Sequence, residues 1–262
     1  MRIFDRVALV LCALTASMAQ AQQAPGSQMD AILNIGSSSA HDQKIGYARG
    51  QILKEAAMAL GARAGLADRS KELFALLDTR ATGLDARYNF NPLVIGASVL
   101  PPVISESKDV VALEATAMRV AGAVYHIDEP ARFAMPTPTW RDWMYVGLDP
   151  AAVSVPALGA SGPANEAEKQ LWQRLVKESY ALGRQQAQEV FDANLALLER
   201  AHEGMRRYFD LWQRGMVSAP IIATANDLVV RDDPNSISVG NTLFRITAPT
   251  DFRPHQQWTP LE

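Results

Sequence analysis

The feature that most constrains the fold is a long apolar stripe in the second half of the chain. Apolar residues recur at steps of three or four from Trp172 to Met216, which is the period of an α-helix. Just upstream, Asn165 precedes Glu168 by three residues, a spacing typical of a helix start. The stripe predicts an amphipathic helix much longer than the mean in globular proteins, and leaves open whether it breaks at Gly183 or Gly204.

A second helical region is predicted over residues 42–79, where apolar residues recur at multiples of three and four. Four glycines interrupt it as two pairs spaced four residues apart, so that each pair lies on one helix face: Gly46, Gly50, Gly61 and Gly65. Each glycine costs about 1 kcal/mol relative to alanine in a helix interior. The pairs therefore indicate either a face that another backbone approaches closely or, for Gly61 and Gly65, the end of a helix.

The rest of the chain favours short strands. Residues 91–163 hold nine of the fifteen prolines, with strand-like runs at 110–113 and 118–127. Thr139 and Asp142 indicate a short capped helix. Residues 228–230 and 243–247 flank a turn-rich centre and predict a C-terminal β-hairpin.

Together these patterns predict an α+β fold with a helical N-terminal region, a proline-rich middle with short strands, a long amphipathic helix and a C-terminal hairpin. We expect one domain over residues 42–248 and an extended tail over 249–262, where three prolines occur without periodicity.

The first 21 residues have the three zones of an export signal. Arg2 and Arg6 provide the basic start, an apolar run of 7–19 follows, and Ala19-Gln20-Ala21 fits a cleavage site. The sequence thus predicts a signal peptide over 1–21, a flexible leader over 22–41 and a location in the bacterial periplasm.

Cys12 is the single cysteine, and it lies inside that apolar run. The residue before it is Leu11, whereas lipoprotein processing requires a small side chain there. We therefore expect no lipid anchor, and any association with the outer membrane would depend on partners. Without Arg2, Arg6 and Asp5 the chain has 23 basic and 27 acidic residues, which argues against direct binding to nucleic acid.

No pattern for catalysis, a cofactor or a metal emerges. The four histidines are far apart in sequence, and His126 has an acidic neighbour, Asp128, on the same face of the predicted strand. The segment from Gly96 to Leu100 begins like a nucleophile elbow and lacks its last glycine. We expect no enzyme, no cofactor and no metal site; a hydrolase that uses carboxylates stays open, since such pairs cannot be identified from sequence.

Several segments, in order, resemble the DotC family of type IVB (Dot/Icm-type) secretion systems, whose relatives serve IncI-type conjugation. The resemblance extends from about Asp42 to Thr247, and no single motif decides it. The matching segments are Gly61-Ala62-Arg63-Ala64-Gly65-Leu66-Ala67 with Arg69, Leu84-Asp85 with Tyr88 and Phe90, Leu100-Pro101-Pro102-Val103-Ile104, Ala131-Arg132-Phe133, Pro138-Thr139-Trp140-Arg141-Asp142, Glu168-Lys169 with Trp172, Gly183 with Gln186 and Ala187, Phe191-Asp192-Ala193-Asn194-Leu195, Gly215-Met216-Val217-Ser218 with Pro220, and Arg245-Ile246-Thr247.

This resemblance implies a structural subunit of an outer-membrane core complex, present in several copies in a ring with DotD-like and DotH-like partners. It implies no catalytic residues. From the residues themselves, the candidate partner-contact positions are Gly61, Gly65, Trp140, Trp143, Trp172 and Trp212. The glycine pairs and the segment around Trp140 are equally compatible with packing inside the chain. The alternative function is a stand-alone periplasmic binding protein or chaperone.

Overall fold

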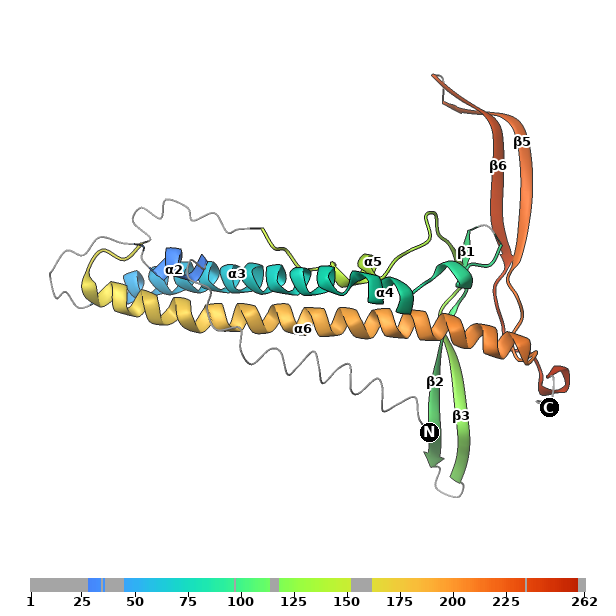
Figure 1. Cartoon of the computed structure of the whole chain (residues 1–262), viewed down its shortest axis with the longest axis horizontal. Coiled ribbons are helices and arrows are strands. Elements are labelled where there is room, and N and C mark those ends of the chain that lie inside the picture. Colours follow the sequence, from blue (N-terminus) through green and yellow to red (C-terminus); the bar gives the residue numbers. More distant parts are fainter. Residues whose placement is uncertain are drawn as a thin grey trace. The chain divides into compact units, whose positions relative to one another are not determined.

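The computed structural model describes residues 28–33, 35, 45–96, 98–113, 118–151, 162–233 and 235–258. The predicted signal peptide and most of the predicted leader lie outside the described residues. The α+β fold class is confirmed (Figure 1). The elements are α2 (Gln28–Leu33), α3 (Tyr47–Thr79), α4 (Ala81–Arg87), η2 (Asn91–Leu93), β1 (Val99–Leu100), β2 (Val103–Leu113), β3 (Met118–Glu129), β4 (Arg132–Phe133), α5 (Arg141–Met144), α6 (Glu166–Gln213), β5 (Ile221–Asp233), β6 (Ser236–Ala248) and η4 (His255–Gln257).

The predicted single domain divides into two compact units. The first combines the described residues of 1–79 with those of 147–191, and the second combines 80–146 with 192–262. Helix α6 supplies residues to both units, because the boundary falls between Phe191 and Asp192.

The long helix α6 is continuous through 48 residues, so it breaks neither at Gly183 nor at Gly204. Its start follows the predicted signature, since the side-chain oxygen of Asn165 accepts a hydrogen bond of 2.9 Å from the backbone N–H of Glu168. Gly204 lies inside the helix, where a Cβ would meet the backbone nitrogen of Ile104 at 2.9 Å. A small residue at this position lets the N-terminal end of β2 pack directly against the helix.

Helices α2, α3 and the first half of α6 form the first unit, in which α3 and α6 lie side by side (Figure 1). Its core combines one residue of α2, four residues of α3 at helical spacing and two residues of α6. They are Ile32 of α2, Leu53, Ala57, Leu60 and Ala64 of α3, and Trp172 and Val176 of α6. The structure differs from the expected flexible leader over Gln28–Leu33, because Ile32 is an apolar side chain that the helix buries in this core.

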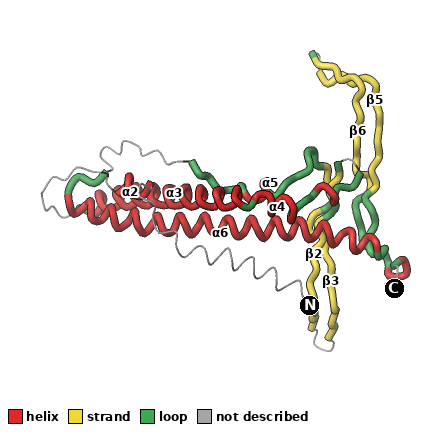
Figure 2. The backbone as a smooth tube through the Cα atoms, viewed as in Figure 1, coloured by secondary structure: helices red, strands yellow, loops and turns green. Residues whose placement is uncertain are grey.

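The second unit contains the six strands that the structure describes, arranged as three separate antiparallel pairs: β1 with β4, β2 with β3, and β5 with β6. Figure 2 shows β2–β3 and β5–β6 as long paired strands. Both hairpins extend well beyond the predicted runs, to 11 and 12 residues in the first and 13 in each strand of the second. Both are two-stranded in the part of the chain that the structure describes.

The predicted extended tail has structure as far as residue 258. Phe252 forms a β-bridge with Val217, and the backbone N–H of Arg253 donates a 2.8 Å hydrogen bond to the carbonyl of Met216. A short 3-10 helix, η4, follows. The backbone after the hairpin thus returns to the end of α6, a long-range pairing that local periodicity does not reveal.

Candidate functional site

Gly61 and Gly65 lie in the interior of α3 and end no helix. Both are buried against α6: a Cβ on Gly61 would overlap the hydroxyl of Ser179, and one on Gly65 would overlap the carbonyl oxygen of Tyr180. On the opposing helix, a Cβ on Gly183 would overlap the carbonyl oxygen of Ala62. The glycines therefore serve a backbone-to-backbone contact inside the chain, the packing alternative that the sequence left open.

Polar contacts fix the same helix pair one turn further along. Arg184 donates two hydrogen bonds, of 2.7 and 2.9 Å, to the carboxylate of Glu72, and Arg69 donates a third of 2.7 Å. Tyr180 donates to Asp68 at 2.9 Å. Burial, together with this hydrogen bond, raises the pKa of Tyr180 to about 12. A network of this kind holds the register of one helix against the other.

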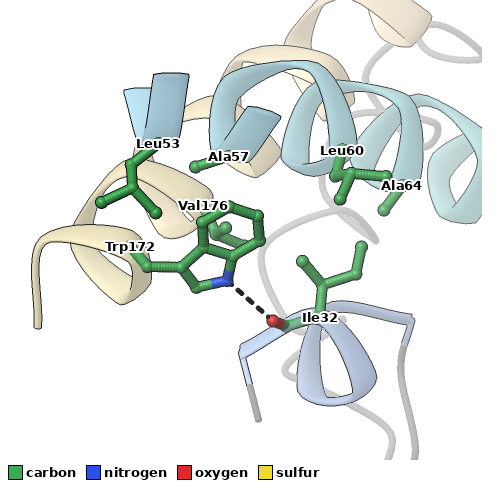
Figure 3. Packing of buried hydrophobic residues seen from close by; sticks show 7 residues of the cluster. All are labelled: Ile32, Leu53, Ala57, Leu60, Ala64, Trp172 and Val176. Carbon is green, nitrogen blue, oxygen red and sulfur yellow. Dashed lines mark hydrogen bonds between the residues drawn. The ribbon is translucent and has the colours of Figure 1, made fainter. Parts of the chain in front are cut away.

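Trp172 is fully buried in the first unit. Figure 3 shows its indole among Leu53, Val176 and Ile32, with the ring N–H directed at the carbonyl oxygen of Ile32, 2.9 Å away. This bond satisfies the one polar atom of the side chain, as buried tryptophans require. Trp172 therefore belongs to the chain's own core, and its indole is covered within the unit.

Trp140 and Trp143 hold the start of α5 against residues 85–90, which lie in and just after α4. Trp140 is buried and donates a 2.6 Å hydrogen bond from its indole to Asp85, which also accepts one of 2.9 Å from Arg141. Trp143 stacks on Phe90 with ring centroids 4.9 Å apart. The carboxylate of Asp142 accepts a hydrogen bond of 2.6 Å from the backbone N–H of Thr139. The predicted short helix forms, but the expectation that Thr139 caps it is wrong, because Trp140 is the N-cap residue and no side chain makes a capping hydrogen bond.

Trp212 differs from the other three tryptophans among the candidates, because 46% of its surface is exposed in the last turn of α6. Two further aromatic residues of the same unit, Phe252 and Trp258, are 40% and 45% exposed. Of the six candidate positions, Trp212 offers the most side-chain surface to a partner.

A further open surface of the second unit is the β5–β6 ribbon, by which we mean the hairpin Ile221–Ala248. In β5, Ile221 and residues 223–226 are exposed, and so are residues 242–245 of β6. Leu243 and Phe244 are each half exposed although they are large and apolar. Sequence reasoning missed these positions; the available signal was a strand-forming run without charges in residues 221–226.

The β2–β3 hairpin, in contrast, is anchored at its base. Ile104 is fully buried in a cluster with Tyr208, Leu211 and Val217, against which Tyr125 and Ile127 of β3 also pack. Arg207 of α6 donates a 2.8 Å hydrogen bond to the carbonyl oxygen of Ile104. Further out, Asp109 has a positive φ of 52°, in the left-handed region that ordinary residues rarely adopt. The base of the β2–β3 hairpin is thus packed against α6, and the backbone of β2 is irregular at Asp109.

His202 of α6 lies in an aromatic setting. Its ring meets those of Tyr88 and Phe90 edge-on, at centroid distances of 5.5 and 5.3 Å. Burial, with the nearby positive charge of Arg206, lowers its pKa. The lowered pKa favours the neutral imidazole at neutral pH, which suits a ring packed among aromatic side chains.

The histidine–carboxylate pair His126 and Asp128 lies on β3, where both residues are exposed. His126 is the register partner of Ser105, whose hydroxyl donates a 2.9 Å hydrogen bond to Asp128. In a catalytic triad the serine proton goes to the imidazole, so this arrangement does not activate Ser105. Within the ranges that the structure describes, no group of three His, Cys, Asp or Glu residues is placed to hold a metal ion.

Among the described helices, none combines the length and apolar character needed to cross a membrane. No curated protein matches the chain. Residues 47–260 match a family described as type IV secretory system, conjugal DNA-protein transfer (TraI). The match begins with α3 and includes both hairpins, and it covers well over half of the chain. The chain therefore belongs to this TraI family of the type IV secretory system and is a component of type IV secretion and conjugal transfer.

Proposed function

We propose that this chain is a structural subunit of the outer-membrane core complex of a type IVB secretion or conjugation machine. It is located in the periplasm, is present in several copies in a ring, and assembles with DotD-like and DotH-like partners. It acts by assembly, without turnover and without a cofactor. The observation that carries the proposal is the family match over 47–260, whose description names conjugal transfer.

The DotC-like segments support the finer assignment through their positions in the fold. Leu84-Asp85 and Pro138-Thr139-Trp140-Arg141-Asp142 are separate segments of the sequence, and Asp85 accepts hydrogen bonds from both Trp140 and Arg141. Residues 61–67 and Gly183 form the close helix contact. A resemblance that lies in mutually contacting residues favours a shared fold rather than scattered similarity.

The surfaces of the second unit support an assembly role. The β5–β6 ribbon and the aromatic residues Trp212, Phe252 and Trp258 leave large apolar side chains in contact with solvent. Exposed apolar side chains on extended elements are typical of surfaces that a partner covers. On this proposal, partners that cover these surfaces also hold the chain at the outer membrane.

The test is to express a C-terminally tagged chain with the rest of the secretion machinery, extract the envelopes gently, and identify what co-purifies and at what size. We expect a very large particle that contains DotD-like and DotH-like proteins. A soluble periplasmic monomer without partners would overturn the proposal in favour of a binding protein or chaperone. Turnover of cell-wall glycans by the purified chain would favour a hydrolase.

Two tryptophan variants sharpen the test. Trp212→Ala is expected to leave folding intact and to reduce recovery of the partners, since its side chain is half exposed. Trp140→Ala is the matched control, because its indole is buried and bonded to Asp85; it should lower folding stability first. Unchanged partner recovery in Trp212→Ala would remove this surface from the proposed interface.

A further inference from the structure

The β5–β6 ribbon has two edges without a partner strand. In the part of the chain that the structure describes, β5 pairs with β6 and neither pairs with a third strand. Each strand has 13 residues, about 44 Å at the usual rise. Every second residue of an edge strand directs its backbone N–H and C=O outward. The ribbon therefore offers two long rows of backbone donors and acceptors.

An isolated two-stranded hairpin is only marginally stable in water, and a third strand or a covering element is normally needed. Over residues 223–226 and 242–245, every residue of the ribbon is exposed. The stretch thus has neither a covering element nor an additional strand within its unit. Its long, regular form indicates that another chain completes it.

Over residues 221–226 and 242–248, the edges also lack most of the usual protection against strand pairing. Natural edges carry charges, prolines or bulges that discourage a neighbour. Residues 221–226 have no charge and no proline, and residues 242–248 contain one charged residue, Arg245. The irregularities of register lie at the two ends, between Ile221 and Ile222 and between Arg231 and Asp233. The stretch between them is regular in register, and its first part, up to Asn226 in β5, is an uncharged edge suited to pairing; the outer part of β5 carries Asp227, Arg231, Asp232 and Asp233.

We propose that β5 of one copy of this chain pairs with β6 of the next copy, so that the ribbons of neighbouring copies form one continuous antiparallel sheet. This inference rests on the proposed ring of copies. Rotation about a ring axis places the β5 edge of each copy beside the β6 edge of its neighbour. Because the strands of a hairpin run in opposite directions, the new pair is automatically antiparallel.

Geometry favours a second copy over a strand from a different protein. The two strands have equal length, so the neighbouring edges match from end to end. Closure around the ring removes both edges from every copy at once, whereas a strand from another protein on one edge leaves the second edge open. Arg245 would meet the uncharged residues 221–226 of the neighbour if the strands pair in the register of the hairpin itself.

Disulfide trapping between two tagged copies tests the pairing directly. The one native cysteine, Cys12, is first replaced in a Cys12→Ala chain. One tagged copy then carries Thr224→Cys in β5, and the second copy, with a different tag, carries a single cysteine at each of the 13 positions of β6 in turn. The copies are co-expressed with the secretion machinery, and the purified particle is oxidised.

We expect a disulfide-linked dimer of the two tags to peak at one β6 position. Paired strands bring opposite Cα atoms within bridging distance, whereas a shift of two residues does not. At the peak position, the yield of dimer should be about ten times the yield obtained when both copies carry Thr224→Cys. In that second case the two cysteines lie too far apart, since cysteines with Cα atoms more than ~7 Å apart cannot be bridged. The hairpin β2–β3 provides a matched control: Lys108→Cys in one copy and Ala123→Cys in the other should give no dimer, although these positions pair within one chain.

The outcomes separate this inference from the proposed function. A particle with its partners that gives no dimer at any β6 position overturns the strand pairing and leaves the assembly role intact. Dimers between two Thr224→Cys copies, or an adduct with a different protein, also overturn it, because they show β5 against β5 or a foreign strand. Failure to recover any particle with the unmodified chain overturns the proposed function itself.

Discussion

The contact between α3 and α6 and the β5–β6 ribbon illustrate two ways in which this chain treats an apolar surface. At the helix contact, glycines bring backbones together, Trp172 fills the core, and charged side chains bridge the two helices. At the ribbon, Leu243 and Phe244 are half exposed, and each of the two described strands has one edge without a partner strand. The first region is complete within the chain, whereas the second, on our proposal, is completed by a neighbouring copy.

This difference predicts whether a substitution changes the free energy of unfolding or the assembly of the chain. A region that the chain completes by itself should show its substitutions in the free energy of unfolding. A region that awaits another chain should show them in assembly and leave unfolding unchanged. The four predictions below test this division, and they are arranged from the largest expected effect on stability to the smallest.

Trp172→Ala should have the largest effect. Removal of a fully buried tryptophan leaves a cavity and an unpaired carbonyl at Ile32, and it should lower the free energy of unfolding by about 3–5 kcal/mol. Urea denaturation followed by circular dichroism measures it. Trp212→Ala is the control, with an expected change of less than about 1 kcal/mol because the side chain is half exposed. Equal effects would mean that the two tryptophans do not differ as described.

Glu168→Gln should come next. Glu168 is buried and accepts hydrogen bonds of 3.0 and 2.8 Å from Arg49. These bonds lower the pKa of Glu168 below its usual value of 4.5, against the opposing effect of burial, and the backbone N–H of Ala164 adds to the lowering. Loss of a charged hydrogen bond should lower the free energy of unfolding by about 1.5–3 kcal/mol at neutral pH.

The sign of the pH dependence follows from that lowered pKa. The folded state holds the proton of Glu168 less tightly than the unfolded state, so the carboxylate stabilises the fold above about pH 4.5 and ceases to do so as the pH falls further. Urea midpoints of the native chain and Glu168→Gln should therefore differ at pH 7 and converge in acid. A difference that stays constant with pH would show that the ion pair is not the cause.

Gly183→Ala should destabilise the helix contact although alanine favours helices. The new methyl group overlaps the carbonyl oxygen of Ala62, and such overpacking costs about 1–3 kcal/mol. Gly83→Ala in α4 is the matched control, because nothing lies within 4 Å of its Cβ position. There we expect a gain of up to about 1 kcal/mol. Thermal unfolding should therefore shift in opposite directions for the two variants.

Phe244→Ser should have the smallest effect on stability. Half of the side chain is exposed, so the free energy of unfolding of the isolated chain should change by no more than about 0.5 kcal/mol. Recovery of the assembled particle should fall, because the ribbon loses apolar surface that a neighbour would cover. A large loss of stability with normal assembly would break the comparison between the two regions.

The long helix and the hairpins could be predicted because periodicity is a local property. The apolar stripe of α6 fixed its length to within a few residues, and strand-forming runs located β3 and β6. The strand ends were underestimated, since exposed strands lack the alternation that a buried face imposes. Helix α2 was missed because Ile32 is buried only through contact with residues more than 20 positions away.

The candidate contact residues show the limit more clearly. Sequence alone cannot tell a tryptophan that faces a partner from one that faces its own chain, since both require the same apolar surface. The indole of Trp140 is buried and donates a hydrogen bond to Asp85, which is 55 residues away in the sequence. Gly61 is buried because Ser179 of α6 lies opposite it. Such pairings are properties of the tertiary fold.

Helix α6 also determines when this chain can fold. Trp172 contacts Leu53 and bonds to Ile32, while Tyr208 and Leu211 complete the core around Ile104. Both compact units thus need residues that leave the ribosome, and cross any export channel, after most of the chain. Contacts this distant in sequence form slowly and leave earlier segments uncovered in the meantime. A chain that ends before α6 would lack part of both cores. A truncated chain should therefore fail to fold either unit.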